Sequence, residues 1–286
     1  MLDSRIARWA RQSAWARPIG ILAYRTVDRL SPATPGARVL VNAVPKAGTH
    51  LLMGLYDEVP GFRFTGRLVW VTEVDQHDDD CVQAARRIKK NFDRCRPSHY
   101  LMGHVMHHPR VSDALASSDV TVVTMVRDPR AIAASAVRYF EESKLRQRDL
   151  GENRFDSREE LAQWLIDGDG PFGARRSIPP LAERCRQYLG WLDDPTCLVV
   201  RFEDLIGEQG GSSREAQVRE IERILRFSEV PADVTAEQVA ARIYSGSSHT
   251  FSVGKVRSWE SVLTPGQIAQ IEDAAADVLE RLGYEH

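Results

Sequence analysis

Short apolar segments alternate with longer helical patterns along this chain of 286 residues. Each apolar segment is about four to eight residues long and rich in Val or Leu, which is typical of strands buried on both faces of a parallel sheet. A longer segment that contains Trp70 has a weaker pattern. The predicted strands are 37–44, 62–74, 99–104, 119–126 and 196–202.

The segments between these strands have the periodicity of helices. The last of them opens with Thr264 and Pro265, a capping residue followed by a proline in the first turn. Strands that alternate with helices predict an α/β fold, in which a parallel β-sheet of four to five strands is flanked by helices through right-handed crossovers. The stretches 148–177 and 206–213 are polar or rich in glycine and predict surface loops. The predicted helices are 49–58, 79–94, 130–147, 178–192, 214–227, 234–244 and 265–282.

No shift in composition marks a second folded domain, so we expect one domain over residues 37–286 and a basic helical segment over 1–36. The N-terminal segment carries six arginines and two tryptophans. Such a helix can lie on an anionic membrane. It can also pack its tryptophans on the body of the protein. We favour this second reading, because a single basic helix is a weak signal for membrane binding. A peripheral contact with a membrane remains open.

The composition limits the function classes. The formal net charge is −2, which argues against nucleic-acid binding by the chain as a whole. The four cysteines form no C-x-x-C pair, and with no signal peptide in the sequence they favour a cytoplasmic location. No uncharged apolar run approaches the ~18 residues of a membrane-spanning helix.

The segment PKAGTH, residues 45–50, follows the first predicted strand and precedes a helix. Backbone N–H groups and the helix dipole favour an anion at this position. Gly48 allows close approach of the backbone, Lys46 adds a positive charge and Thr49 adds a hydroxyl. The segment differs from the nucleoside-triphosphate loop, which needs two glycines and a lysine directly before the Ser or Thr. It predicts a phosphate-binding loop, and a plain turn with an exposed lysine is the alternative.

A second segment, residues 123–140, has the same order of strand, charged turn and helix. Arg127 ends the strand, and Ser135 lies eight residues later on the helix. A guanidinium and a hydroxyl can hold a phosphate dianion. The alternative is a surface pair between Arg127 and Asp128. Two anion sites on neighbouring strand ends predict a ligand with two separated phosphate groups.

These motifs resemble those of the sulfotransferases that use 3′-phosphoadenylyl sulfate (PAPS). Residues 45–50 resemble the family's 5′-phosphosulfate loop, and Arg127 with Ser135 resembles its 3′-phosphate site. The segment RFEDL, residues 201–205, and the segment 251–267 resemble two later family motifs. The resemblance implies a three-layer architecture like that of P-loop proteins and PAPS as co-substrate, with no metal. The nucleotide-binding residues that it implies are Lys46, Ala47, Gly48, Thr49, His50, Leu51, Arg127, Ser135, Gly254, Lys255 and Arg257.

The sequence departs from the family pattern at several of these positions. His50 stands where the family usually has Ser or Thr, and Leu51 where an adenine-stacking tryptophan often stands. Ser252 and Val253 replace an Arg-Lys pair in the C-terminal motif. The resemblance therefore leaves open whether Lys255 or Arg257 meets the 3′-phosphate.

The resemblance also implies a base that accepts the proton of the acceptor hydroxyl, together with Lys46 at the leaving oxygen. Family members carry a catalytic histidine at a strand end about twenty residues before the arginine. His104 lies 23 residues before Arg127 and closes the predicted strand, so we expect it to be the base. Glu73 is the alternative base. His107 and His108 could instead share a metal with His104, although no acidic residue or cysteine lies close to them in sequence.

The predicted function is the transfer of a sulfuryl group from PAPS to a hydroxyl of an alcohol, phenol, saccharide or lipid. A nucleotide phosphotransferase with an unusual loop is the second reading, in which Asp128 would hold magnesium. A protein that only binds the nucleotide is the third.

Overall fold

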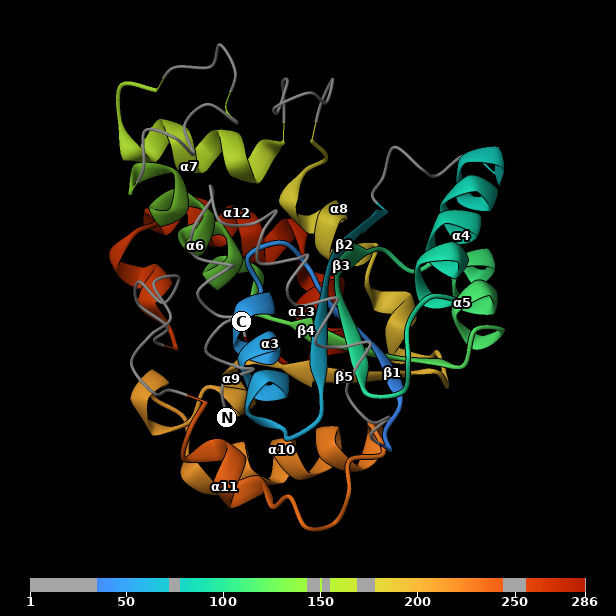
Figure 1. Ribbon diagram of the computed structural model, residues 1–286. Helices are drawn as coiled ribbons and strands as arrows, with labels where there is room; N and C mark the ends of the chain where they lie inside the picture. Colours follow the sequence, from blue (N-terminus) through green and yellow to red (C-terminus); the bar gives the residue numbers. More distant parts are fainter. Residues whose placement is uncertain are drawn as a thin grey trace.

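The computed structural model describes residues 35–71, 78–142, 150, 155–168, 178–243 and 256–285. A five-stranded sheet lies at its centre (Figure 1), and the spatial order of the strands is β2-β3-β1-β4-β5. Every neighbouring pair is parallel. The predicted α/β class and the parallel sheet are therefore confirmed. The strands are β1 (Arg38–Ala43), β2 (Arg63–Val71), β3 (His99–Val105), β4 (Val120–Val126) and β5 (Cys197–Arg201).

The hydrophobic core is centred on β1 and β4. Five of the six residues of β1 and six of the seven of β4 are buried, because helices cover both faces of the sheet. The helix α3 (Thr49–Glu58) lies on one face, while α4 (Asp78–Phe92) and α5 (Pro109–Ala116) lie side by side on the other (Figure 1). This arrangement gives the three layers expected from right-handed crossovers.

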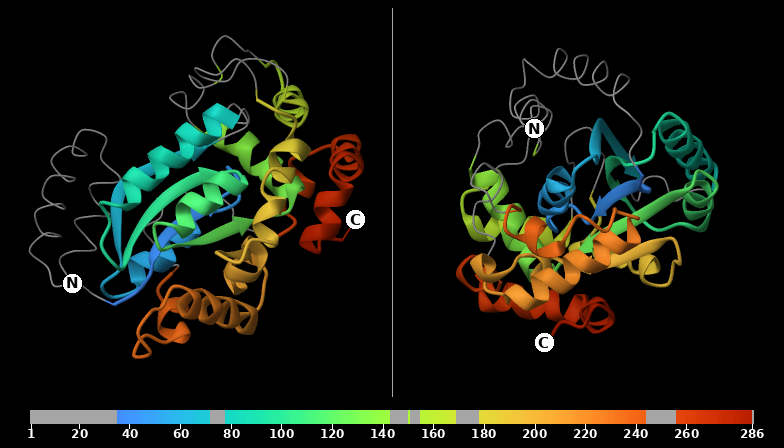
Figure 2. Two further views of the ribbon diagram at one scale, coloured as in Figure 1. Left: turned by 90° about the vertical axis from the view of Figure 1, so that its right-hand side faces the viewer. Right: turned by 60° about the horizontal axis from the view of Figure 1, so that its bottom comes forward.

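The remaining helices surround the sheet at its ends. In the views of Figure 2, α10 and α11 lie together on one side of the molecule, and α12 and α13 lie together on another. The helix α6 follows β4 and packs against α7, α8 and α12. Their bounds are α6 (Pro129–Glu141), α7 (Arg158–Asp167), α8 (Leu181–Arg186), α9 (Phe202–Leu205), α10 (Arg214–Phe227), α11 (Ala236–Ala240), α12 (Pro265–Ala274) and α13 (Ala276–Leu282); the 3-10 turns are η3 (Leu189–Leu192), η4 (Glu208–Gly210) and η5 (Ser258–Ser261).

Four sequence-based expectations need correction. The expected helix 178–192 is divided into α8 and the 3-10 turn η3. The stretch 148–177 is not a loop throughout, because α7 forms within it: Ser157 caps the helix through the N–H of Glu160, and Gly168 ends it in a left-handed conformation. The stretch 206–213 contains the short turn η4. The expected helix 265–282 is divided into α12 and α13 at Ala275, whose ψ of 23° departs from helical geometry.

The carboxyl ends of β1, β3 and β4 are neighbours in the sheet, because β1 pairs with both β3 and β4. After β1 the chain crosses to the edge strand β2, whereas β4 lies on the opposite side of β1. Ligands of open parallel sheets bind at such a point, where the strand order reverses. Lys46 and Arg127 both follow strands that meet there.

Candidate functional site

The loop between β1 and α3 has an unusual backbone. Lys46 has a φ of 73°, which is rare for a residue with a side chain, and Gly48 has a φ of 116° at the start of α3. A Cβ atom at Gly48 would lie 2.5 Å from the Phe202 ring and 2.7 Å from the sulfur of Met125. Only glycine fits this position, so the loop packs tightly against β4 and α9. Left-handed backbone at a residue other than glycine is concentrated at functional sites.

The side chain of Lys46 reaches the helix that follows β4. Its Nζ lies 3.6 Å from the centroid of the Tyr139 ring on α6. A cation over an aromatic face is held by the ring quadrupole. Ser135 is half-buried one turn earlier on α6, on the same side of the helix as Tyr139. Tyr139 therefore connects Lys46 to α6, the helix that carries Ser135. No sequence signal indicated this contact.

Arg127 connects the two predicted anion sites. Its side chain is 6% exposed, its Nη1 donates to the carbonyl oxygen of Lys46 at 3.4 Å, and its guanidinium lies 3.9 Å from the centroid of the Phe202 ring. Its Nε is buried and has no hydrogen-bond partner among the described residues. Burial lowers the pKa of Arg127, and the charge of Glu203 is the largest influence that opposes this. A buried cation with an unpartnered N–H fits an anionic ligand.

His104 lies at the end of β3, beside the phosphate-binding loop. It is 8% exposed, and its Nδ1 lies 2.8 Å from the carbonyl oxygen of Ala43, the last residue of β1. Because a carbonyl oxygen only accepts, Nδ1 must be the donor, and Nε2 carries the lone pair of the neutral ring. The Trp70 ring meets the imidazole edge to face, with centroids 4.6 Å apart.

Asn42 fixes the backbone next to His104. Its Oδ1 accepts from the N–H of Val105, and its Nδ2 donates to the carbonyl oxygen of Val105 and to the hydroxyl of Thr124. The side chain thus extends the hydrogen bonding between β1 and β3 beyond the last paired residues and ties both strands to β4. Buried polar groups with all partners present hold one geometry. Sequence analysis missed Asn42, although a polar residue inside an apolar strand was a signal.

The other histidines of the cluster have separate structural contacts. His107 Nε2 lies 3.2 Å from Asp194 Oδ2, and its ring packs on Trp191. His108 caps α5 by accepting from the N–H of Arg110, and His99 accepts from the N–H of Arg96. Within the described ranges no three His, Cys, Asp or Glu side chains gather as metal ligands would. The expectation that the site needs no metal stays a prediction.

The remaining predicted nucleotide residues differ in exposure. The side chains of Ala47, Thr49 and Leu51 are buried, so they shape the loop from inside, and His50 is exposed on the first turn of α3. Arg257 is exposed and bonds to Glu260 at 2.8 Å. Gly254, Lys255 and the alternative base Glu73 lie outside the described residues. Their roles, and those of Leu51 and Arg257, stay predictions.

Both carboxylate oxygens of Asp128 are hydrogen-bonded to Arg130. Asp128 caps α6 by accepting from the N–H of Arg130, and its two oxygens also accept from the guanidinium of Arg130 at 2.8 to 3.1 Å. A magnesium-holding carboxylate, as the phosphotransferase reading requires, would have to give up these bonds. The structure therefore favours a structural role for Asp128.

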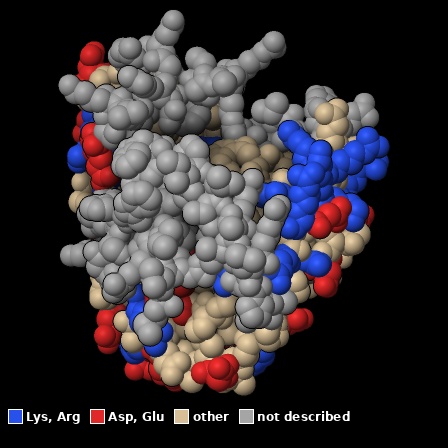
Figure 3. Space-filling model, viewed as in Figure 1, with Lys and Arg blue, Asp and Glu red and all other residues tan. Residues whose placement is uncertain are grey.

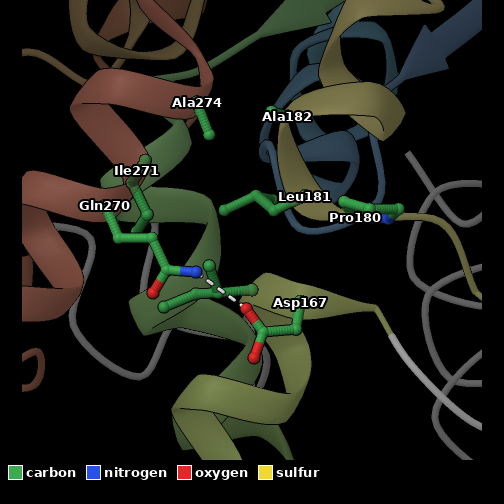
Figure 4. Close-up of a pocket in the computed structure, with 8 residues that line it drawn as sticks. Asp167, Pro180, Leu181, Ala182, Gln270, Ile271 and Ala274 are labelled. Carbon is green, nitrogen blue, oxygen red and sulfur yellow. Dashed lines mark hydrogen bonds between the residues drawn. The ribbon is translucent and has the colours of Figure 1, made fainter.

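A pocket of about 170 Å³ lies between α7, α8 and α12, with Asp167 and Gln270 hydrogen-bonded across it (Figure 4). None of the predicted site residues lines it, so it is separate from the anion sites.

Elsewhere on the surface, Lys and Arg gather on the side formed by α4 and α5 (Figure 3). Arg86, Arg87, Lys89 and Lys90 are exposed there, as expected for a solvated helix face.

No helix in the described part of the chain is both long and apolar enough to cross a membrane.

Comparison with known families gives one match that covers nearly the whole domain. The sulfotransferase domain family matches residues 37–283. Human carbohydrate sulfotransferase 2 is 28% identical over 195 residues, which cover 58% of this chain and 35% of that protein. The mouse protein of the same name matches to the same extent. The chain therefore spans about a third of the length of these relatives.

Solved structures show the same fold. Mouse sulfotransferase SULT7A1 complexed with 3′-phosphoadenosine 5′-phosphate (PAP) superposes with a TM-score of 0.55 at 14% identity, over 85% of both chains. Retinol dehydratase in complex with androsterone and the inactive cofactor PAP superposes with a TM-score of 0.51 at 14% identity, over 85% of this chain and 80% of that one.

Proposed function

Because the chain belongs to the sulfotransferase domain family, we propose that it transfers the sulfuryl group of PAPS to a hydroxyl of an acceptor. The observation that carries this proposal is the buried Arg127 next to the loop that contains Lys46, since its Nε lacks a hydrogen-bond partner in the part of the chain that the structure describes. Two cationic side chains from neighbouring strand ends suit a nucleotide with phosphate groups at two positions. The two solved structures described above contain PAP.

In this proposal each reacting group has one task. The acceptor oxygen forms a bond to sulfur while the bond between sulfur and the 5′-phosphate oxygen breaks in line. Nε2 of His104 takes the acceptor proton, because Nδ1 is committed to the carbonyl of Ala43. Lys46 meets the negative charge that grows on the departing oxygen. Arg127 and Ser135 hold the 3′-phosphate.

We propose a saccharide as the acceptor. Trp70 and Leu68 are 39% and 51% exposed, and they point to the same face of β2 as a consequence of strand alternation. Trp70 also touches His104. An open aromatic surface can stack on the C–H face of a sugar, whereas a lipid needs an enclosed site to leave water. The names of the carbohydrate sulfotransferase relatives support the same class.

The location of the protein and the role of residues 1–36 are further proposals. A cytoplasmic location rests on the cysteine usage, and contact with a membrane rests on the basic N-terminus, which lies outside the described residues. Fractionation of cells that express the full chain and a variant lacking residues 1–36 would test both proposals.

Calorimetry with PAP and adenosine 5′-phosphate tests the nucleotide site. Each charge-assisted hydrogen bond to the 3′-phosphate contributes about 1.5–3 kcal/mol, so adenosine 5′-phosphate should bind at least about tenfold more weakly. Equal affinities would remove Arg127 from the nucleotide site.

Incubation with labelled PAPS and a panel of saccharide, phenol and lipid acceptors then identifies the acceptor, and labelling only of lipids would contradict the saccharide proposal. Absolute dependence on magnesium would favour the phosphotransferase reading.

A further inference from the structure

Glu203 lies beside Arg127 but does not bond to it. The guanidinium of Arg127 packs on the ring of Phe202, the residue before Glu203. Among the described residues no ion pair joins Arg127 to a carboxylate, yet the charge of Glu203 is the largest influence that raises the pKa of Arg127 against the effect of burial. Glu203 thus balances part of the buried charge of Arg127 without occupying its N–H groups.

Both oxygens of Glu203 are held by other donors. The N–H of Asp128 donates to Oε1 at 3.2 Å, and the hydroxyl of Tyr284 donates to Oε2 at 2.7 Å. Burial raises the pKa of Glu203, whereas the hydrogen bond from Tyr284 and the charge of Arg127 lower it. Two donors on the two oxygens favour the ionised carboxylate. They also keep the group in an orientation that does not form the two-bond fork with a guanidinium that carboxylates prefer.

Tyr284 is itself fixed by β5. The guanidinium of Arg201 lies 4.3 Å from the centroid of the Tyr284 ring, and its Nη1 donates to the carbonyl oxygen of Gly283 at 3.2 Å. Gly283 turns the chain at the end of α13 with a φ of 70°. The C-terminal residues are therefore held against the strand end from which Glu203 extends.

We propose that Tyr284 and Glu203 are positioning residues for the nucleotide site, in which Tyr284 holds the carboxylate of Glu203 away from Arg127 so that the guanidinium stays available to the 3′-phosphate. This inference rests on the proposed function. Without the Tyr284 hydroxyl, Oε2 of Glu203 would be a buried acceptor without a partner, which is unfavourable. The carboxylate would then turn toward a buried cation with an unused donor.

Arg127 is that cation. Two arginines face Glu203, and Arg201 already bonds to the Gly283 carbonyl and lies 3.9 Å from Asp204. Within the described ranges, Nε of Arg127 and Nε of Arg201 both lack a hydrogen-bond partner. Arg127 is almost completely buried, whereas the Arg201 side chain is 35% exposed, so Arg127 gains more from an ion pair. Asp128 repels the carboxylate in either orientation and is already paired with Arg130. An internal pair between Glu203 and Arg127 would compete directly with the 3′-phosphate.

The test is Tyr284→Phe, with calorimetric titration of PAP and of adenosine 5′-phosphate. Loss of one charge-assisted bond to the 3′-phosphate should weaken PAP about tenfold, while adenosine 5′-phosphate should change by no more than about twofold. Tyr56→Phe is the matched control, since its buried hydroxyl lies 2.6 Å from Ser228 Oγ. That variant should keep the parental ratio of the two affinities even if its melting temperature falls.

Adding Glu203→Gln to Tyr284→Phe supplies the second measurement. A neutral amide cannot form the competing ion pair, so the double variant should regain most of the lost preference for PAP. An unchanged ratio in Tyr284→Phe, or an equal loss for both nucleotides, would overturn the inference while leaving the proposed function in place. A parental protein that does not distinguish the two nucleotides would overturn the assignment of Arg127 and the inference with it.

Discussion

In His104, a hydrogen bond to a backbone carbonyl determines which imidazole nitrogen can accept a proton. The carbonyl oxygen of Ala43 accepts from Nδ1, which leaves Nε2 as the nitrogen that can accept a proton. Trp70 packs on the same ring. A neutral imidazole with an unprotonated ring nitrogen can accept the proton of a hydroxyl.

We expect His104→Ala to lower the turnover number by about 10²–10⁴, the usual contribution of a general base. Affinity for PAP should stay at the parental value, and the deficit should shrink for acceptors with more acidic hydroxyls. His108→Ser is the control, because serine keeps the cap of α5 that His108 provides. Near-parental turnover in His104→Ala would move the role of base to Glu73 or His107.

Lys46→Ala should reduce turnover more than it reduces affinity for PAP. The ammonium lies over Tyr139 and is expected to meet charge that develops only in the transition state, so its loss affects the turnover number. Steady-state kinetics and calorimetry on the same variant separate the two effects. A loss confined to affinity would make Lys46 a ground-state ligand of the nucleotide.

The element that most constrains the site is the loop between β1 and α3, where Gly48 sits against Phe202 and Met125. Gly48→Ala should lower the free energy of unfolding by about 2–4 kcal/mol, from backbone strain and overpacking together, and should also weaken PAP binding. Gly54 lies on the same helix with open space around it. Gly54→Ala should instead stabilise the protein by about 0.5–1 kcal/mol, and urea unfolding measures both variants. A Gly48→Ala protein as stable as the parent would mean that the loop tolerates a side chain there.

At the scale of the whole molecule, Arg130 links helices that are distant in sequence. It pairs with Asp128 at 2.8 Å and Glu272 at 2.5 Å, donates to the carbonyl of Glu285, and lies 4.6 Å from the Trp259 ring centroid. It thus joins α6 to α12 and to the C-terminal residues that hold Glu203. These contacts fix the C-terminal part of the chain against the strand end that carries Arg127.

We expect Arg130→Met to lower the free energy of unfolding by about 3–5 kcal/mol, because it leaves the buried carboxylate of Asp128 and the partly exposed carboxylate of Glu272 without the guanidinium that pairs with them. Arg158→Met removes an exposed pair with Glu141 and should cost about 0–1 kcal/mol. Urea unfolding of the two variants gives the comparison. Similar small losses in both would show that the Arg130 cluster is as well hydrated as a surface pair.

The sequence alone determined the elements whose signals are local. Short apolar runs predicted the strands β1, β3, β4 and β5, and a weaker pattern predicted β2. The order of strand, charged turn and helix singled out Lys46 and Arg127. The same local logic would have found α7, since Ser157, Glu160 and Gly168 are ordinary start and stop signals within a stretch that was taken for a loop.

Only the tertiary structure decided which of these residues meet. Arg127 reaches the carbonyl of Lys46, and Tyr284 reaches Glu203 across 81 positions of the chain. The tertiary structure also separated His104 from the other histidines. His104 contacts Ala43 on β1 and Trp70 on β2, the two strands that flank β3. Periodicity and capping depend on neighbours within a few residues, whereas these contacts depend on how strands order in the sheet and how helices pack on it. The chemistry of the site was therefore visible in the sequence as residue types, and their partners were set by packing.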